Sequence, residues 1–407
     1  MPPKSKNSPV LSKGPYPDMN NFPFARRTNW SQETNSLNKT LEDLARRQIS
    51  VIDLTASNPT SCGFTYPKGM LSAFNSLENL HYQPDACGVS KAREAVAKYY
   101  THQKLSLSPR DIVLTASTSE AYSFLMRLLV NPGEKVLIPS PSYPLFQFLL
   151  EINDVKFDYY SLSYDGQWHL DRQALERLME GKPKAIILVN PNNPTGSYIS
   201  RSDLNFLNEL CHQHQVSIIS DEVFFEYALV SSDAVSCAGN QAVLTFVLGG
   251  LSKTLGLPQM KCSWILASGP QGVLQESLAR LEIIADTYLS VNTPVQNALS
   301  VWLEQAPEFR KQIMTRVQEN RQWLSGHLND HTELLSLQGG WYATLRIPAV
   351  KSEEEWVLEF LKEDAVLVYP GYFFDFEKEA YIVLSLISSI ASFREGVGRI
   401  LQRLAKV

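Results

Sequence analysis

The chain has 407 residues, of which 44% are hydrophobic and 19% charged, so it can bury a large core and is expected to form two domains. Its formal net charge is −5 and its Lys and Arg residues are scattered, which gives no electrostatic basis for binding nucleic acid. Nowhere do about 18 apolar residues follow one another, which excludes a transmembrane helix.

The first residues are polar and rich in Pro and Ser, without the apolar segment of a signal peptide or membrane anchor. We expect an arm to about Asn29 and then a helix at about 37–48 that belongs with the C-terminal part. Residues 1–52 are therefore predicted to form an N-terminal arm and a helix that joins the small domain.

From about residue 53 to 290, strand and helix patterns alternate along the chain. The strands are predicted near Ile112 and at 135–138, 185–189, 217–220, 245–248 and 263–267. This alternation predicts an α/β domain with a mostly parallel sheet and helices on both faces. After residue 291 the pattern is helical to 328 and strand-like at 340–346 and 381–386, which predicts a smaller α+β domain at 291–407.

Hydroxyl residues follow the strand at 111–114, in the segment 115–120. Thr118 and Ser119 lie where an apolar helix opens. Hydroxyls and backbone amides at a helix start suit a phosphate, although Ser119 taken alone would be interpreted as an N-cap.

Two further polar groups follow apolar strands. The strand at 184–190 leads into the turn Pro-Asn-Asn-Pro-Thr-Gly, which puts the Asn193 amide at the strand's carboxyl end. The strand at 216–220 ends at Asp221. In isolation these would be a turn residue and an ordinary strand-end acid. Together, an amide suits the phenolic oxygen of pyridoxal phosphate (PLP), and a carboxylate can keep its pyridine nitrogen protonated.

Lys253 follows the apolar strand at 245–248 and two glycines, in Ser-Lys-Thr-Leu-Gly-Leu-Pro. Burial at such a strand end lowers the pKa of an amine and makes it a nucleophile toward an aldehyde. A lone Ser-Lys pair is more often a solvated surface feature. Because Asn193, Asp221 and Lys253 all fall at strand carboxyl ends, where α/β proteins bind ligands, we interpret them as one cofactor site.

In order and spacing, the Asn-Pro-Thr-Gly, Asp-Glu-Val and Ser-Lys-Thr segments resemble the fold-type I PLP enzymes of the class I/II aminotransferase family, over about 54–386. The resemblance implies that Lys253 holds PLP as a Schiff base (an aldimine), that Asp221 pairs with the pyridine nitrogen and that Asn193 donates to the phenolic oxygen. The remaining matches are the phosphate contacts Thr118, Ser119 and Ser252, the ring-stacking Tyr143, the substrate-side Ser57 and Asn58, and Tyr82. Tyr82 resembles the tyrosine that reaches the phosphate of the neighbouring subunit, which implies a homodimer.

The chain also departs from the family's pattern near the cofactor. Phe224 stands where the family usually has a tyrosine that donates to the phenolic oxygen. Lys261 replaces a phosphate-binding arginine, and its ammonium is a point charge that cannot form the two parallel hydrogen bonds of a guanidinium. Gly250 replaces a serine.

The largest departure is Val383, at the position of the arginine that clamps the substrate α-carboxylate. Either another cation has taken over, with Arg346 and Arg394 as candidates, or the amine substrate lacks that carboxylate. Without the resemblance, both arginines would be interpreted as surface or structural residues.

The resemblance implies a PLP-dependent aminotransferase that moves an amino group from an amine or amino acid to a keto acid. The alternatives are other PLP chemistry on the same fold, such as β-elimination or decarboxylation, and a non-catalytic PLP-binding module. The five cysteines form no Cys-x-x-Cys pair, which favours free thiols in the cytoplasm over disulfides or zinc. His327 and His331 are interpreted as residues of a solvated helix, and no metal is expected.

Overall fold

A computed structural model of the chain describes residues 23–31, 35–101, 105–230, 233–378 and 380–406. The described residues divide into two compact units, one before and one after residues 32–34. In the first unit, the described residues include the short 3-10 helix η2 (Arg26–Thr28), where Thr28 Oγ1 donates to the Ala25 carbonyl oxygen over 2.8 Å. Most of the expected N-terminal arm lies outside the described residues.

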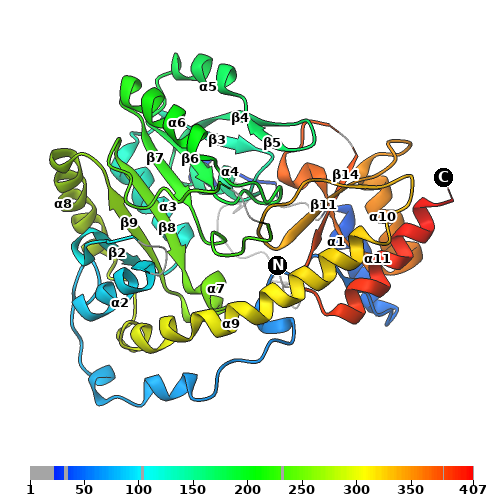
Figure 1. Ribbon diagram of the computed structural model, residues 1–407, viewed down its shortest axis with the longest axis horizontal. Coiled ribbons are helices and arrows are strands. Elements are labelled where there is room, and N and C mark those ends of the chain that lie inside the picture. Colours follow the sequence, from blue (N-terminus) through cyan, green and yellow to red (C-terminus); the bar gives the residue numbers. More distant parts are fainter. Residues whose placement is uncertain (1–22, 32–34, 102–104, 231–232, 379, 407) are drawn as a thin grey trace, which may run out of the picture. The chain divides into compact units, whose positions relative to one another are not determined.

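In the second unit, an eight-stranded sheet forms the framework of the region at 112–268 (Figure 1). Its strands, in spatial order, are β2 (Ile112–Thr115), β9 (Ser263–Ser268), β8 (Thr245–Gly250), β7 (Ser217–Asp221), β6 (Ala185–Val189), β3 (Lys135–Ser140), β4 (Lys156–Tyr164) and β5 (Trp168–Leu170). The neighbours from β8 through β4 run parallel, and the pairs at both ends run antiparallel. The predicted mostly parallel sheet is confirmed.

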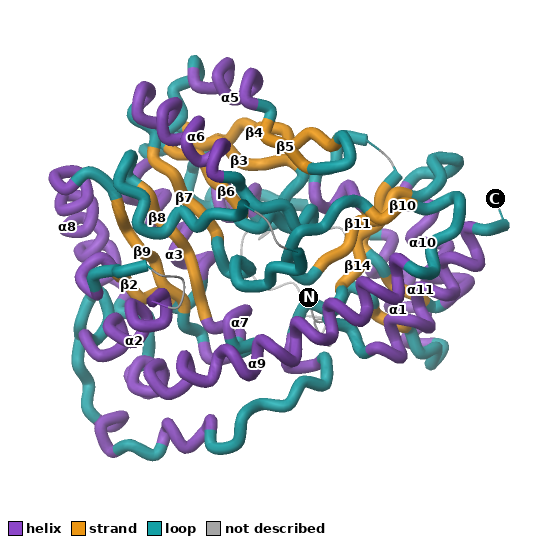
Figure 2. Tube along the Cα trace, viewed as in Figure 1, coloured by secondary structure: helices purple, strands orange, loops and turns teal. Residues whose placement is uncertain are grey.

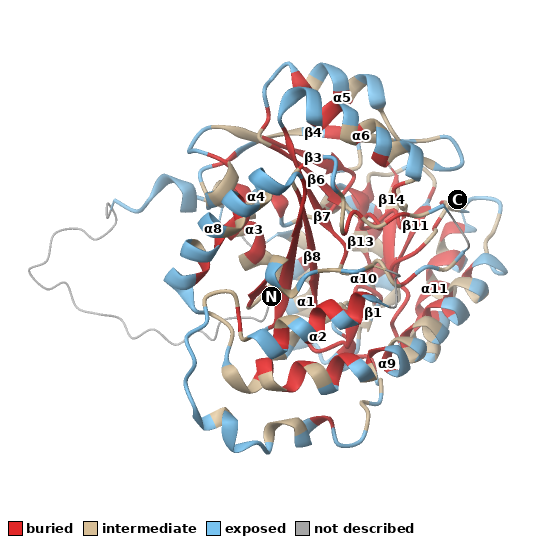
Figure 3. Cartoon of the chain, turned by 60° about the vertical axis from the view of Figure 1, so that its left-hand side comes forward, coloured by how far each residue is buried: buried red, intermediate tan, exposed pale blue. Residues whose placement is uncertain are grey.

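Helices cover both faces of this sheet, because both faces are apolar. Along β8, Phe246 and Leu248 belong to one buried cluster and Val247 to the other, as the two-residue period of a strand requires. One cluster includes helices α3 (Thr118–Leu129), α4 (Phe146–Glu151) and α8 (Gln271–Tyr288), and the other includes α2 (Ser90–Tyr100), α5 (Arg172–Met179) and α6 (Arg201–His214). Figure 3 shows the buried strands between more exposed helices.

A smaller sheet lies in the C-terminal part. Its strands, in order, are β10 (Glu333–Leu334), β11 (Tyr342–Arg346), β14 (Tyr381–Ser385) and β13 (Tyr369–Pro370), and all neighbours are antiparallel. Helices α10 (Glu353–Asp364) and α11 (Ile390–Leu404) pack against it or each other. The expected strands at 340–346 and 381–386 are thus observed as β11 and β14.

The segment at 36–53 contacts this C-terminal part. Helix α1 (Ser36–Arg46) packs on α10, and β1 (Ile52–Asp53) pairs in parallel with β12 (Val366–Leu367). The exact domain boundaries at 52/53 and 290/291 stay predictions.

The helix α9 (Thr293–Ser325) connects the two regions (Figure 2). It contacts α2 on the side of the large sheet and α11 on the side of the small sheet. Short helical segments complete the fold: α7 (Leu251–Thr254), η3 (Pro59–Ser61), η4 (Met70–Phe74), η5 (Leu77–Leu80), η7 (Pro109–Asp111), η8 (Pro258–Met260) and η9 (Gly371–Phe374). Among the described helices, none combines the length and apolarity needed to cross a membrane.

Candidate active site

Asn193, Asp221 and Lys253 lie at one edge of the large sheet. Asn193 follows β6, Asp221 is the last residue of β7, and Lys253 lies on the single turn α7 that follows β8. These three strands are adjacent and parallel, so their carboxyl ends meet at the same edge. The three residues therefore lie at the ends of adjacent strands, at one edge of the sheet.

Asp221 is a buried carboxylate, with only 8% of its surface exposed. The Tyr122 hydroxyl donates to its Oδ2 and the Val223 amide to its Oδ1, each over 3.2 Å. Burial raises the pKa of Asp221 to about 6, although both hydrogen bonds and the Lys253 charge oppose this shift. A cation bound beside the carboxylate would stabilise its charged form.

Lys253 carries an amine with a lowered pKa. Burial brings that pKa to about 8, against the opposing influence of Asp221 and Cys62. The Nζ atom lies 4.9 Å from the ring centre of Trp341 and 5.1 Å from that of Phe224. A substantial neutral fraction near pH 8 makes this amine a nucleophile and a base.

Asn193 lies in a loop that other groups hold in place. The Asn192 side-chain nitrogen donates to the Pro141 carbonyl over 2.9 Å and to Thr195 Oγ1 over 3.0 Å. By contrast, the Asn193 Oδ1 is buried and has no hydrogen-bond partner among the described residues. A buried polar group left unpaired is unfavourable by roughly 1–3 kcal/mol. Because an amide oxygen only accepts, a hydrogen bond to the phenolic oxygen of PLP would come from the Asn193 side-chain nitrogen.

Thr118 and Ser119 occupy the first two positions of α3 and are half-buried. The N-cap role that the sequence alone suggests for Ser119 belongs to Ser117, whose Oγ accepts from the Glu120 amide over 3.1 Å. The amides of the first helical turn have no acceptor within the helix, so those of Thr118 and Ser119 can bind an anion.

Glu120 binds a backbone amide next to this helix start, which the sequence did not reveal. Its Oε2 accepts from the Ala116 amide and from Ser290 Oγ, each over 2.6 Å. The Ala116 amide is therefore already used and does not add to the candidate phosphate site.

Tyr143 lies close to Asp221. Burial raises the pKa of Tyr143 to about 12, with the charges of Asp221 and Tyr369 as further causes. Its ring contacts Phe146 edge to face, at 5.7 Å between centres. A half-buried aromatic ring next to Asp221 suits stacking on a ring whose nitrogen Asp221 binds.

The structure explains the glycine at position 250. A Cβ atom there would lie 2.3 Å from Ser263 Oγ and 3.1 Å from Ser263 Cα, so the family's serine has no room. Ser252 is half-buried beside Lys253, and Lys261 is exposed at a left-handed position, with φ of 50°. Lys261 forms no ion pair with a described residue.

On the expected substrate side, Ser57 and Asn58 differ in their surroundings. Ser57 hydrogen-bonds the Tyr342 hydroxyl, and Tyr342 also lies near Cys62. Asn58 is exposed, and its Oδ1 accepts from the amide and the hydroxyl of Thr60, so it caps η3. The geometry favours Ser57 over Asn58 as a wall residue of the site.

Val383 is fully buried in the small sheet, between its cross-strand partners Thr344 and Tyr369. Arg346 lies two residues beyond Thr344, about 7 Å along the strand. Its guanidinium is 45% exposed and pairs with Glu333 over 2.5 Å. Arg394 is exposed on α11. Arg346 and Arg394 therefore stay candidates for the substrate cation, and Arg346 is already paired with a carboxylate.

Arg316 on α9 was missed by the sequence reasoning. Its Nη1 lies 3.3–3.4 Å from the carbonyl oxygens of Cys62, Ile387 and Ser388, and it forms no ion pair with a described carboxylate. Both Arg316 and Lys253 lower the pKa of the Cys62 thiol, against burial, which raises it. Arg316 is thus a cation close to Cys62, but no motif in a long helix marks it.

Tyr82 has 74% of its surface exposed. It lines a cavity of about 320 Å³ together with Ser290, Asn292 and the start of α9. Such a side chain is available to a neighbouring molecule.

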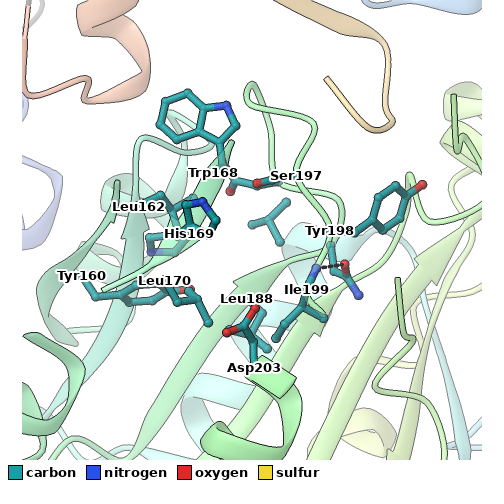
Figure 4. A pocket seen from close by; sticks show the side chains of 14 residues that line it. Tyr160, Leu162, Trp168, His169, Leu170, Leu188, Ser197, Tyr198, Ile199 and Asp203 are labelled. Atoms are coloured by element: carbon teal, nitrogen blue, oxygen red, sulfur yellow. Dashed lines mark hydrogen bonds between the residues drawn. The ribbon is translucent and has the colours of Figure 1, made fainter. Parts of the chain in front are cut away.

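A second cavity, of about 40 Å³, lies between β4–β5 and the loop after β6 (Figure 4). Its lining includes Asn190 and Asn192 but none of Asn193, Asp221 and Lys253. Because none of these three residues lines it, the cavity is separate from the candidate site. It has room for only a few water molecules.

No cluster of three or more potential metal ligands occurs in the described part of the chain. The His327 Nδ1 interacts with the Trp323 carbonyl over 2.8 Å, and the two rings stack at 4.1 Å. His327 and His331 lie in turns after α9, which ends at Ser325, and not in the expected helix.

Comparison with known proteins places this geometry in a family. The profile described as "Aminotransferase class I and II" matches residues 26–388. Glutamate-pyruvate aminotransferase AlaA of Haemophilus influenzae is 25% identical, covering 87% of this chain and 91% of its own. Tyrosine aminotransferase of Mus musculus is 27% identical, over 83% of this chain and 77% of its own.

Solved structures share the fold. Alanine aminotransferase from Pyrococcus furiosus matches with a TM-score of 0.84 and 24% identity, covering 91% of this chain and 96% of its own. An aminotransferase from Escherichia coli matches with a TM-score of 0.82 and 22% identity, covering 94% and 98%. The predicted fold type I architecture is confirmed.

Proposed function

The chain belongs to the class I and II aminotransferase family, whose members use PLP, and on this premise we propose that Lys253, Asp221 and Asn193 form its active site. The protein is a PLP-dependent aminotransferase. The observation that supports the site is the convergence of a low-pKa amine, a buried carboxylate and an unpaired buried amide at one sheet edge.

These residues fit PLP group by group. Lys253 would bind the aldehyde, Asp221 the pyridine nitrogen, and the Asn193 amide the phenolic oxygen. Thr118, Ser119 and Ser252 would hold the phosphate, with Lys261 adding charge and Tyr143 stacking on the ring. Bound PLP supplies an electron sink that stabilises negative charge on a substrate carbon.

The residues around the cofactor then divide the proton transfers. Asp221 holds a proton at the pyridine nitrogen. Lys253 Nζ would take the proton from the substrate α-carbon and later give it back, a task that suits a pKa of about 8. The family match favours transamination over β-elimination and decarboxylation, and the presence of both Lys253 and Asp221 argues against a non-catalytic module.

We further propose that the amino donor is not held at position 383. Val383 is fully buried beside its cross-strand partner Tyr369, so position 383 offers no charge where the family places a carboxylate-binding arginine. The donor is therefore either an amine without an α-carboxylate or an amino acid whose carboxylate binds another cation. Arg316 is a further candidate, because its described partners are carbonyl oxygens, whereas the charge of Arg346 is already balanced by Glu333.

Matched pairs of donors test this proposal. Conversion of the bound cofactor to pyridoxamine phosphate, followed by absorbance, is compared for each amino acid and its decarboxylated amine. Loss of a desolvated bidentate contact is worth roughly 2–5 kcal/mol, so aspartate and alanine are expected to bind about thirtyfold more weakly than a preferred donor.

Variants of the three candidate arginines then distinguish a donor without an α-carboxylate from an amino acid held by another cation. If an amino acid is preferred, Arg316→Ala should weaken it strongly, while Arg346→Ala and Arg394→Ala serve as matched controls. Efficient turnover of common α-amino acids that all three variants leave undiminished would refute the argument from Val383. Release of ammonia and keto acid without pyridoxamine phosphate would favour a lyase.

We propose that the enzyme works as a homodimer, to which Tyr82 contributes across the interface. Large apolar side chains are exposed over 71–82 and near the end of α8: Leu71, Leu77, Leu80, Tyr82, Ile283, Tyr288 and Leu289. Tyr82 and Leu289 line the same cavity, so these segments are neighbours. Exposed apolar patches of this kind mark interfaces.

Sedimentation of the purified chain is expected to give a dimer. Leu77→Asp combined with Leu80→Asp should shift it toward the monomer and weaken PLP binding, whereas Val350→Asp, an exposed site elsewhere, should do neither. A monomeric wild type that binds PLP tightly would contradict this proposal.

We also propose a cytoplasmic location. Its support is that the five cysteines are free thiols, four of them buried. Cell fractionation tests it, and recovery from an oxidising compartment would count against it.

A further inference from the structure

Trp341 is fully buried, with 0% of its surface exposed, and it borders the Lys253 amine. It directly precedes β11, and the centre of its ring lies 4.9 Å from Lys253 Nζ. Any group that becomes attached to Lys253 Nζ is therefore within reach of this indole.

The indole nitrogen of Trp341 has no acceptor. Its Nε1 is buried, and no described residue accepts a hydrogen bond from it. An indole N–H can only donate, and buried indoles usually find a partner because an unpaired donor destabilises the fold. The acceptor is therefore expected to come with a ligand.

The indole also lies against the residue that has lost a donor. The Phe224 and Trp341 rings meet edge to face, 5.1 Å apart, and Lys253 Nζ lies 5.1 Å from Phe224. At position 224 the family has a tyrosine whose hydroxyl donates to the phenolic oxygen of PLP. Phenylalanine provides no such hydroxyl.

Nearby tyrosine hydroxyls are already engaged. The Tyr227 hydroxyl donates to the Lys253 carbonyl oxygen over 2.6 Å, and the Tyr122 hydroxyl donates to Asp221. The Tyr342 hydroxyl is bound to Ser57. Trp341 is thus a buried donor beside both Lys253 and Phe224 that is not engaged by a described residue.

We propose that the Trp341 indole N–H donates a hydrogen bond to the phenolic oxygen of PLP and replaces the tyrosine hydroxyl that Phe224 lacks. This inference rests on the proposed function, because it requires PLP on Lys253. Trp341 then shares with Asn193 the task of stabilising negative charge on that oxygen. A better stabilised oxygen attracts the neighbouring nitrogen-bound proton less, so it lowers the pKa of the lysine-bound cofactor.

The test is a spectrophotometric pH titration of the PLP-loaded protein. Trp341→Phe removes the donor, and the pKa of the lysine-bound cofactor is expected to rise by about one unit, which is a tenfold change in proton affinity. Phe224→Tyr restores a hydroxyl, so alone it should lower this pKa, and in the Trp341→Phe background it should reverse most of the rise.

A shape-matched replacement separates the hydrogen bond from packing. 3-Benzothienylalanine at position 341 keeps the bicyclic ring but has sulfur in place of the N–H, so it should produce the same rise, even where Trp341→Phe fails to fold. A rise in Trp341→Phe alone would assign the effect to packing and overturn the proposal. If both Trp341 replacements leave the pKa of the lysine-bound cofactor unchanged, the proposal is overturned as well. This holds also if they raise the KM for a carboxylate substrate, which would assign Trp341 to substrate binding.

Failure of the proposed function looks different in the same experiment. If the wild type acquires no visible PLP absorbance, the assignment of the cofactor site itself is wrong. If the wild type binds PLP and titrates but the Trp341 replacements leave the pKa unchanged, only the role of Trp341 is wrong.

Discussion

Asp221→Asn is expected to slow turnover by about two to four orders of magnitude while PLP stays bound. A neutral amide cannot balance the charge of a protonated pyridine nitrogen, and removing one partner of a buried ion pair is worth roughly 3–5 kcal/mol. Single-turnover kinetics with a donor that the wild type uses would measure the loss. Tyr122→Phe is the matched control, because it removes only a hydrogen bond to the same carboxylate and should slow turnover far less.

The pH dependence of PLP binding provides a second measurement on Asp221. The carboxylate has a pKa of about 6 before the cofactor binds, and a bound cation lowers that pKa. Binding is therefore strongest above pH 6 and weakens as the pH falls through this value, where the carboxylate takes up a proton. In Asp221→Asn this dependence should disappear. Turnover of that variant within about tenfold of wild type would mean that Asp221 is structural.

Six strands of the large sheet could be predicted from the sequence, because buried strands are apolar along most of their length. The strands β4 and β5 were missed, since they lie at the sheet edge and only one residue of β4 is fully buried. A half-exposed edge strand has no clear hydrophobic pattern.

The convergence of Asn193, Asp221 and Lys253 was predictable because parallel strands bring their carboxyl ends together. Ser117 caps α3, and not Ser119, which the sequence allowed as an alternative, since the run Thr-Ala-Ser-Thr-Ser offers several hydroxyls and only the extended backbone of Ser117 identifies the cap. Tyr122, Arg316 and Trp341 were not found, because a core tyrosine, a helical arginine and a buried indole differ from ordinary packing residues only in their tertiary partners.

Lys253→Ala is expected to have the largest effect of any single change, because it removes both the attachment point of PLP and the base. General base catalysis alone contributes about 10²–10⁴-fold, so proton transfer should fall by at least that factor. Borohydride reduction of the PLP-loaded wild type should attach a pyridoxyl group to Lys253, and mass spectrometry should find no label in Lys253→Ala. Lys261→Ala, as the control, should keep the label, since Lys261 is exposed and assigned only to the phosphate.

Rescue by a small primary amine distinguishes a lost base from a damaged fold. Lys253 Nζ lies 4.9 Å from the centre of the Trp341 ring and 5.1 Å from that of the Phe224 ring, so its removal leaves space beside them in which added methylamine can take up the proton. Partial recovery of proton transfer that rises with methylamine concentration is therefore expected in Lys253→Ala. The recovered rate of proton transfer should be proportional to the concentration of neutral methylamine and should therefore increase with pH. A pyridoxyl label on Lys261, or wild-type rates in Lys253→Ala, would refute the assignment of Lys253.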